Sequence, residues 1–221
     1  MTLLGTSLAP QVICVVGPTA SGKSDLAQGI ALALGGEVVS ADSMQIYRGM
    51  DIGTGKVPAG ERAVPHWGLD IVDPGRPYSA ALFQDYARER FRDIAARGKR
   101  AVLCGGTGFY VRAAIDDYRF PAGEQERNPI RERYRALLEE SGPAALWDML
   151  NSIDERSAAV IAPADSKRVI RALELAEEGI SYAQQREKLA SIPQSVPARF
   201  VGIEVEPALL RKRIDARVDA M

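Results

Sequence analysis

Apolar runs and helical patterns alternate along the first half of the chain. The run "QVICVVG" at residues 11–17 is rich in β-branched residues and stops at glycine, and Leu26, Ile30 and Leu34 then recur at helical spacing. The runs "GEVVSAD" and "RAVLCGG" also have strand character, and the stretch between them contains a helical pattern that starts at a candidate N-cap, Ser79. Strands that alternate with helices predict a parallel sheet with helices on its faces.

The pattern changes after "DDYRFP". Helical periodicity continues without a convincing strand, so we expect an all-helical insertion at residues 119–195. The run "ARFVGIEVE" then resumes a strand pattern, which predicts that residues 1–118 and 196–221 form one α/β core. A last helical pattern begins at Pro207, a suitable first position, and meets no stop signal. We therefore expect the chain to be a fragment or a shortened form of a longer protein.

The charge of the chain is balanced, because 28 lysine and arginine residues stand against 29 acidic residues. This balance provides no general attraction to nucleic acid or to anionic membranes, so any polyanion site must be local. Cys14 and Cys104 lie inside apolar runs, which indicates small core residues rather than a disulfide or a metal site. The first ten residues lack a basic start, and no apolar run approaches the roughly 18 residues of a membrane-spanning helix. We expect a cytoplasmic, monomeric protein with no membrane partner.

Residues 17–24 carry the spacing G-x-x-x-x-G-K-S between a strand pattern and a helical pattern, which is the context of a phosphate-binding loop. Its backbone N–H groups and the helix N-terminus can surround an anion, Lys23 adds a positive charge, and the Ser24 hydroxyl can ligate Mg²⁺. The predicted diphosphate site comprises Gly17, Pro18, Thr19, Ala20, Ser21, Gly22, Lys23 and Ser24. The alternative, an ordinary glycine-containing turn, leaves Lys23 unexplained.

The loop motif by itself favours a protein that binds ATP or another nucleotide. A nucleotide hydrolase or kinase normally also has an acidic residue at the end of an apolar strand, where it holds Mg²⁺ through water. The strand "RAVLCGG" ends on glycines, and "GLDIVD" offers only Asp70 and Asp73 after a short apolar run. A small-molecule kinase therefore stays an open alternative with an incomplete magnesium site.

Asp42 follows the second predicted strand, in "VVSADSMQIYRGMDIGTGK". The carboxyl ends of neighbouring parallel strands meet at one crevice, so we expect Asp42 near the phosphate loop. A carboxylate there can accept a proton from a nucleophile that attacks the bound phosphate ester. The alternative role is a turn cap, which is common for aspartate in such a sequence.

The chain contains five distinctive stretches: "GPTASGKS", "SADSMQIYRGMDIGTGK", "DIVDP" with "YSAALF", "GGTGFYVRA" and "DSKRVIRALE". Together they closely resemble the tRNA isopentenyltransferase family, the tRNA dimethylallyltransferases, from about residue 11 to residue 221. The resemblance implies a phosphate-loop NTPase-like α/β core. It also implies transfer of a dimethylallyl group from dimethylallyl diphosphate to the exocyclic amino group of the adenine 3′ to the anticodon in tRNA. In that family the phosphate loop holds the diphosphate of the donor, with Mg²⁺ as cofactor.

The resemblance assigns three residues to the chemistry. Asp42 is then the general base or proton acceptor for the adenine amino group, Thr107 forms a hydrogen bond near the bridging region of the donor, and Arg217 contacts the diphosphate. From the residues alone, Thr107 is better explained as a helix N-cap and Arg217 as a solvent-exposed charge.

Further candidate residues would contact the tRNA substrate. They are Asp42, Ser43, Met44, Gln45, Arg48, Lys167, Arg168 and Arg171. In the family the insertion contacts the anticodon stem, although residues 119–190 contain 11 basic and 13 acidic side chains here. Arg127, Arg131 and Arg135 share one helical face of the insertion. For each basic cluster the alternative is a solvated amphipathic surface.

Members of this family usually continue well past residue 221, so we expect a shortened chain to modify RNA weakly or not at all. A binding module without turnover is a further alternative. A related class, the adenylate isopentenyltransferases, transfers the same group to AMP or ADP. The insertion argues against that class, because a free nucleotide needs no clamp around an RNA stem.

Overall fold

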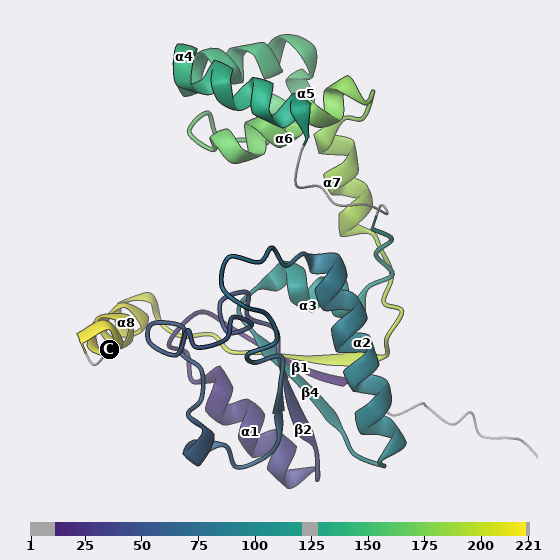
Figure 1. The fold of residues 1–221 in the computed structure, drawn as a ribbon, viewed down its shortest axis with the longest axis vertical. Coiled ribbons are helices and arrows are strands. Elements are labelled where there is room, and N and C mark those ends of the chain that lie inside the picture. Colours follow the sequence, from purple (N-terminus) through teal and green to yellow (C-terminus); the bar gives the residue numbers. More distant parts are fainter. Residues whose placement is uncertain (1–11, 121–127, 220–221) are drawn as a thin grey trace, which may run out of the picture. The chain divides into compact units, whose positions relative to one another are not determined.

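A five-stranded parallel sheet forms the middle layer of the α/β unit, in a computed structural model that describes residues 12–120 and 128–219 (Figure 1). Its strands lie in the order β3-β2-β4-β1-β5. They are β1 (Val12–Val16), β2 (Glu37–Ser40), β3 (His66–Trp67), β4 (Ala101–Gly105) and β5 (Ala198–Gly202). All four strand pairs are parallel, so the carboxyl ends of the strands meet along one edge of the sheet. The predicted α/β fold is confirmed, although the short β3 was not predicted.

One face of the sheet is covered by α1 (Lys23–Ala33), which follows the phosphate loop. The buried residues of α1 are Ala27 and Ala31, while Leu26 and Leu34 are exposed. The apolar spacing in the sequence therefore predicts the helix correctly but not the face that it buries. Two alanines allow the helix backbone to lie close to the strands, which larger side chains on that face would prevent.

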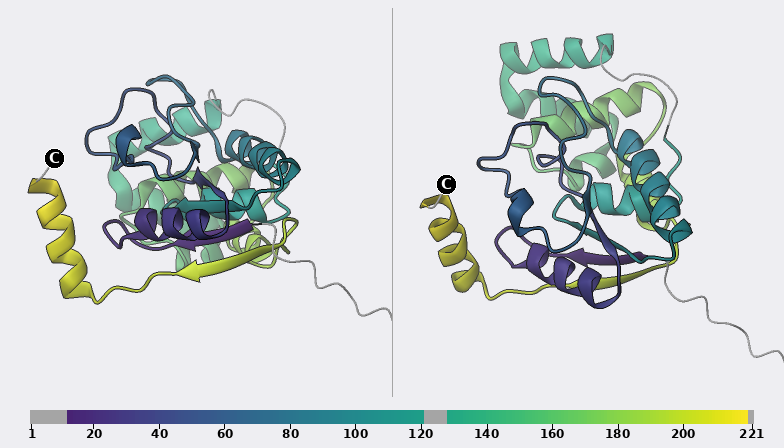
Figure 2. Two further views of the ribbon diagram at one scale, coloured as in Figure 1. Left: turned by 90° about the horizontal axis from the view of Figure 1, so that it is seen from below. Right: turned by 60° about the horizontal axis from the view of Figure 1, so that its bottom comes forward.

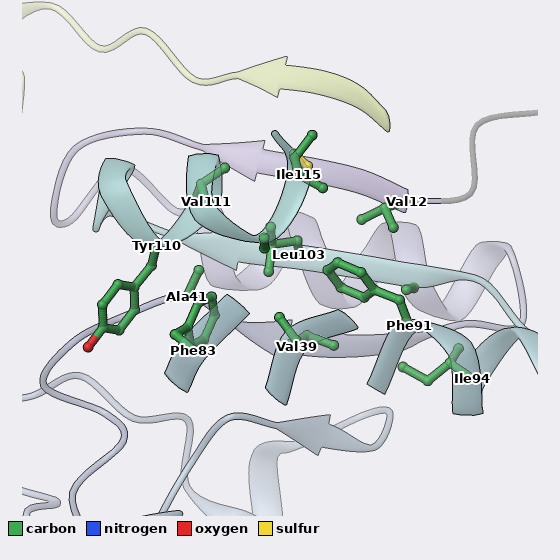
Figure 3. Packing of buried hydrophobic residues seen from close by; sticks show 14 of the residues in the cluster. Val12, Val39, Ala41, Phe83, Phe91, Ile94, Leu103, Tyr110, Val111 and Ile115 are labelled. Carbon is green, nitrogen blue, oxygen red and sulfur yellow. The ribbon is translucent and has the colours of Figure 1, made fainter. Parts of the chain in front are cut away.

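The opposite face is covered by α2 (Ala80–Ala96) and α3 (Gly108–Ile115) (Figure 3). The predicted N-cap of α2 is confirmed, because Ser79 Oγ accepts a hydrogen bond from the backbone N–H of Leu82. The Phe83 ring stacks on Tyr110 with centroids 4.4 Å apart. Burial of a Phe side chain stabilises a fold by about 1.5–3 kcal/mol, so this contact joins α2 firmly to α3.

Glu37, the first residue of β2, carries a buried carboxylate at the edge of the sheet opposite to the carboxyl ends of the strands. Glu37 is fully buried and accepts hydrogen bonds from Arg97 Nη2 at 2.9 Å, Lys99 Nζ at 2.7 Å and Trp67 Nε1 at 2.7 Å. The hydrogen bond from Arg97, against the opposing effect of burial, lowers the pKa of Glu37 to about 2. Glu37 is therefore a structural anion that connects β2, β3 and the end of α2.

The carboxyl-terminal part of the core begins with β5 at the sheet edge, and the chain then continues to α8 (Pro207–Asp219), as both views of Figure 2 show. Pro207 is the first residue of α8, as predicted. No residue of α8 is buried in the part of the chain that the structure describes. The remaining element of the core is a short 3₁₀ helix, η1 (Ala59–Glu61).

A second compact unit spans residues 118–192, and the first comprises the residues described before and after it. This all-helical insertion contains α4 (Pro129–Ile153), α5 (Glu155–Ala159), α6 (Ser166–Glu177) and α7 (Tyr182–Ala190). The α4 helix breaks at Gly142, which has a φ of 79° and precedes Pro143. It therefore consists of two helical segments. Leu146, Leu150 and Leu173 are fully buried within this unit, which therefore has a hydrophobic core of its own.

Both cysteines are buried and free, as predicted. Burial raises the pKa of Cys14 to about 12 and that of Cys104 to about 11, so both thiols stay protonated at neutral pH. Among the described helices, none combines the length and the apolar character needed to cross a membrane.

Candidate active site

The phosphate loop connects β1 to α1 and has the backbone conformation of an anion cradle. Ala20 and Gly22 have φ values of 60° and 86°, and Gly22 is the residue that precedes α1. Such left-handed residues turn successive N–H groups toward a common centre at the positive end of the helix. Lys23 Nζ donates to the carbonyl oxygen of Pro18 at 3.1 Å, so the side chain lies back across the loop.

The hydroxyl of Ser21 provides an independent indication of a ligand. Ser21 is buried, and its Oγ has no hydrogen-bond partner among the described residues. Buried polar atoms without partners are rare because they cost free energy. A phosphate oxygen in the loop would accept a hydrogen bond from this hydroxyl.

A cavity of about 650 Å³ opens on the phosphate loop. This volume lies within the usual range of sites for small molecules, about 300–1,000 Å³. Residues 20–25 form one wall, and the residues opposite are Asp51, Ile52, Gly53, Gly55, Lys56, Val57, Pro58 and Glu61. Arg217 of α8 also lines the cavity, so the structure brings this predicted residue to the phosphate loop. Its guanidinium lies against Gly55, where Nη2 is 1.7 Å from the position that a Cβ would take.

Asp42 and Thr107 lie together at the carboxyl end of the sheet. The Ser43 N–H donates to Thr107 Oγ1 at 3.1 Å, and the Thr107 N–H donates to the carbonyl oxygen of Ala41 at 3.3 Å. Thr107 occupies the N-cap position of α3, as the alternative predicts, but its side chain accepts no hydrogen bond from an N–H of that helix. The Asp42 carboxylate accepts from the N–H of Met44 at 2.9 Å, which is the turn-cap role.

A second, smaller cavity connects Asp42 with the phosphate loop. Its volume is about 20 Å³, enough for about one water molecule. Lys23 and Ser24 line both cavities, and Asp42 and His66 line the smaller one. Burial lowers the pKa of His66, whose Nδ1 lies 2.8 Å from the carbonyl oxygen of Val64. His66 is therefore neutral at pH 7, and its side chain is bound to the segment just before β3.

The last residue of β4, Gly105, cannot be replaced by an acidic residue. A Cβ on Gly105 would lie 2.1 Å from the carbonyl oxygen of Ala41, and no real Cβ approaches an oxygen so closely. Asp70 and Asp73, the substitutes considered from sequence, are occupied elsewhere: Asp70 binds Lys56 Nζ at 2.7 Å and Asp73 binds Arg48 Nη1 at 2.8 Å. The magnesium-holding acid of a nucleotide hydrolase is thus missing from its usual place.

Comparison with known proteins decides the family. Residues 45–221 match the family model described as IPP transferase. This chain belongs to the IPP transferase family. Residues 10–62 also match the model described as Isopentenyl transferase.

Relatives of this IPP transferase carry a shared description. The tRNA dimethylallyltransferase of Desulforudis audaxviator is 41% identical over 97% of the chain, and that of Pseudarthrobacter chlorophenolicus is 47% identical over 96% of it. The chain spans 69% of the length of each. Among solved structures, a tRNA isopentenylpyrophosphate transferase from Staphylococcus epidermidis matches with a TM-score of 0.60 at 36% identity, covering 96% of this chain and 69% of that one. A eukaryotic dimethylallyltransferase acting on tRNA matches with a TM-score of 0.73 at 29% identity, covering 96% of this chain and 52% of that one.

The residues predicted to contact the target base differ in whether their side chains are already bound within the protein. Met44 is exposed. Gln45 is committed to its own fold, because Nε2 donates to the carbonyl oxygens of Thr54 and Gly55, and Oε1 accepts from Ser40 Oγ. A bidentate contact of Gln45 with an adenine would require these bonds to break.

The basic clusters of the insertion are mostly neutralised within the unit. Arg131 and Arg171 both bind the fully buried Glu174. Burial by itself would raise the pKa of Glu174, but the hydrogen bonds and charges of the two arginines together outweigh it, so the pKa is lowered. Arg168 pairs with Asp165, and Arg135 pairs with Glu132. Lys167 is exposed, and Arg127 lies outside the described residues. The side chains of Arg131 and Arg171 therefore have a structural role within the insertion, and the contact of Arg171 with tRNA stays a prediction.

The site fits Mg²⁺ only together with a diphosphate. Across residues 12–120 and 128–219, no group of three or more histidine, cysteine, aspartate or glutamate side chains is arranged to hold a metal ion. Ser24 lines both cavities, and Asp42 lines the smaller one. Mg²⁺ typically takes one or two protein ligands and completes its shell with substrate phosphates and water, which matches this sparse donor set.

Proposed function

We propose that this chain transfers a dimethylallyl group from dimethylallyl diphosphate to the exocyclic amino group of the adenine 3′ to the anticodon in tRNA, releasing diphosphate. The observation that carries the proposal is the cavity in which the phosphate loop, Lys23 and Arg217 face one another. Relatives at 41–47% identity are described as tRNA dimethylallyltransferases.

The leaving group sets the first requirement of this reaction. When the allylic C–O bond breaks, negative charge develops on the diphosphate. Backbone N–H groups of the loop, the Ser21 hydroxyl, Lys23 and Arg217 stabilise that charge, and donors fixed in advance stabilise it more effectively than water does. Ser24 and the diphosphate oxygens would hold Mg²⁺, which supplies further charge neutralisation when bound.

The nucleophile sets the second requirement. The adenine amino group is a weak nucleophile because its lone pair is delocalised into the ring. Asp42 accepts the amino proton as the new C–N bond forms, and Thr107, held at Ser43, orients the donor beside it. The products are the N-prenylated adenine, diphosphate and one proton, so atoms and charge balance.

The insertion is the part that we assign to the tRNA stem. Residues 119–195 would contact the anticodon arm, with Lys167, Arg168 and, beside the site, Arg48 as phosphate contacts. Arg48 and Arg168 are more than half exposed although each is paired with an aspartate, so they can exchange that partner for a phosphate. A base within the anticodon loop must leave its stack to enter the cavity. We infer that the protein acts as a monomer in the cytoplasm, where its tRNA substrate is found.

A competition assay tests the proposal. The chain is incubated with Mg²⁺, radiolabelled dimethylallyl diphosphate, unmodified tRNA and AMP, and the label is followed into each acceptor. Label in tRNA adenine supports the proposal. Label in AMP alone would identify an adenylate isopentenyltransferase. Tight magnesium-dependent ATP binding, with no affinity for dimethylallyl diphosphate, would instead indicate a kinase.

A further inference from the structure

The wall opposite the phosphate loop has no regular secondary structure of its own. It runs from Tyr47 to Pro58, between β2 and η1, and we call it the outer loop. Gly49, Gly53 and Gly55 each have a positive φ in this loop. Glycine-rich irregular segments lose much conformational entropy when they are ordered, so specific contacts must hold the outer loop in place.

A buried ammonium group provides those contacts. The Lys56 side chain is only 4% exposed, although lysine is almost never buried without partners. Its Nζ donates to the carbonyl oxygen of Tyr47 at 2.6 Å, to Asp51 Oδ1 at 2.9 Å and to Asp70 Oδ1 at 2.7 Å. All three ammonium hydrogens are therefore used, and they connect both ends of the outer loop to the segment that follows β3.

The charge on Lys56 persists across the physiological range. Burial opposes the charge, but the hydrogen bonds to Asp70 and Asp51 outweigh it, so the pKa of Lys56 is raised. The pKa of Asp70 is lowered, chiefly by the same hydrogen bond. Removal of the ammonium would leave two carboxylates and a carbonyl oxygen without their shared donor.

The outer loop meets Arg217 at Gly55. Gln45 Nε2 holds this point from inside, at 3.2 Å from the Thr54 carbonyl oxygen and 3.0 Å from that of Gly55. The Arg217 guanidinium occupies the space beside Gly55 where a side chain would begin. No residue of α8 in the described chain is buried, so burial of the helix does little to fix the position of Arg217. The contact with the outer loop at Gly55 therefore matters more for that position.

We propose that Lys56 is a positioning residue, which orders the outer loop as the second wall of the donor cavity and thereby holds Arg217 against the phosphate loop. The proposal rests on the proposed function in one respect, because it takes Arg217 to bind the diphosphate. Lys56 does not need to touch the reacting atoms. Its effect on the reaction should pass through Arg217.

A double-mutant cycle tests this path. Lys56→Met, Arg217→Ala and the combined variant are compared with the wild type for donor kcat/KM, for KM of tRNA and for binding of inorganic diphosphate by calorimetry. A displacement of about 1 Å at a reacting group can reduce a rate about 10²-fold, so Lys56→Met should lose donor kcat/KM on that scale. In the Arg217→Ala background, Lys56→Met should cause little further loss. The KM of tRNA should stay unchanged.

A matched control separates positioning from general destabilisation. Lys99→Met also removes an ammonium that binds a carboxylate, that of Glu37 at 2.7 Å, but at the far edge of the sheet. It should lower stability and leave donor kcat/KM unchanged. Equal losses for Lys56→Met and Lys99→Met, or the same loss from Lys56→Met with and without Arg217, would overturn the proposal.

Two further readouts keep the result decisive. If Lys56→Met fails to fold, Asp70→Asn is used, because it keeps the ammonium and its other two acceptors; a wild-type response of Asp70→Asn in both assays would then count against the proposal. If the wild type transfers no prenyl group to any acceptor, the proposed function fails. Diphosphate binding then decides alone, and Lys56→Met must weaken it only when Arg217 is present.

Discussion

Asp42→Asn separates the two roles that the structure gives this residue. The Asp42 carboxylate caps a turn by accepting the N–H of Met44 at 2.9 Å. Asparagine keeps an oxygen at that position, so the turn and the fold should persist, with a change in unfolding free energy below about 0.5 kcal/mol. The amide cannot accept the amino proton of adenine. Loss of a general base typically reduces a rate about 10²–10⁴-fold, which raises the activation free energy by roughly 3–5 kcal/mol.

The assay for Asp42→Asn is single-turnover transfer, with enzyme and donor premixed before tRNA is added. Donor affinity is measured separately by calorimetry and should be unchanged, because the interaction is made in the transition state rather than in the ground state. Asp42→Ala is the companion variant. It loses the turn bond as well, so it should show the same rate loss and a further destabilisation of about 1 kcal/mol.

Two results would refute this account of Asp42. Wild-type turnover by Asp42→Asn would show that no proton passes to this carboxylate. A rate loss in Asp42→Ala without one in Asp42→Asn would show that the turn alone matters, through the position of Thr107 beside it.

Three more perturbations test the structure around the site. Glu174→Gln should destabilise the insertion by about 3–5 kcal/mol in urea denaturation, because it leaves two arginines without their buried anion, whereas Glu187→Gln breaks an exposed pair and should cost less than about 1 kcal/mol. Glu37 has a folded pKa of about 2 against an ordinary value of 4.5, so its contribution of about 3 kcal/mol is complete above pH 4.5 and is lost as the pH falls toward 2. The difference in stability between wild type and Glu37→Gln should therefore shrink from pH 7 to pH 2.5, and a constant difference would contradict the pairing. Lys167→Ala should weaken tRNA binding and reduce the slope of log K against log[salt] by about 1; an unchanged slope would exclude a phosphate contact there.

Local patterns in the sequence predict the elements that depend on neighbouring residues. The strand before the phosphate loop, the cap at Ser79 and the start of α8 at Pro207 all follow from residues within one turn or strand. The buried face of α1 does not follow from such a local pattern. Ala27 is buried and Leu26 is exposed because the helix lies close to the sheet. The distance between the helix and the sheet is a tertiary quantity.

Long-range ion pairs are the part of the site that sequence patterns miss. Lys56 meets Asp70 across 14 positions, and Arg131 meets Glu174 across 43. A lysine or arginine that will be buried against a carboxylate has no local pattern to distinguish it from a solvated one. The pairing of Arg131 and Arg171 with Glu174 could not be predicted from the sequence for this reason. The position of Arg217 beside the cavity was predicted, but only from the resemblance to a family and not from a local pattern.

The glycine at the end of β4 and the acid at the end of β2 have one structural cause. Gly105 allows the backbone of Ala41 to approach so closely that a Cβ would lie 2.1 Å from its carbonyl oxygen. This approach excludes a magnesium-holding acid on β4, and it also brings the next residue, Asp42, beside Thr107. A phosphoryl transfer needs a carboxylate side chain near the phosphorus atom that is attacked. Breaking an allylic C–O bond needs positive charge and hydrogen-bond donors at the diphosphate. The carboxylate of Asp42, which follows the neighbouring strand β2, can therefore accept the proton of the adenine amino group.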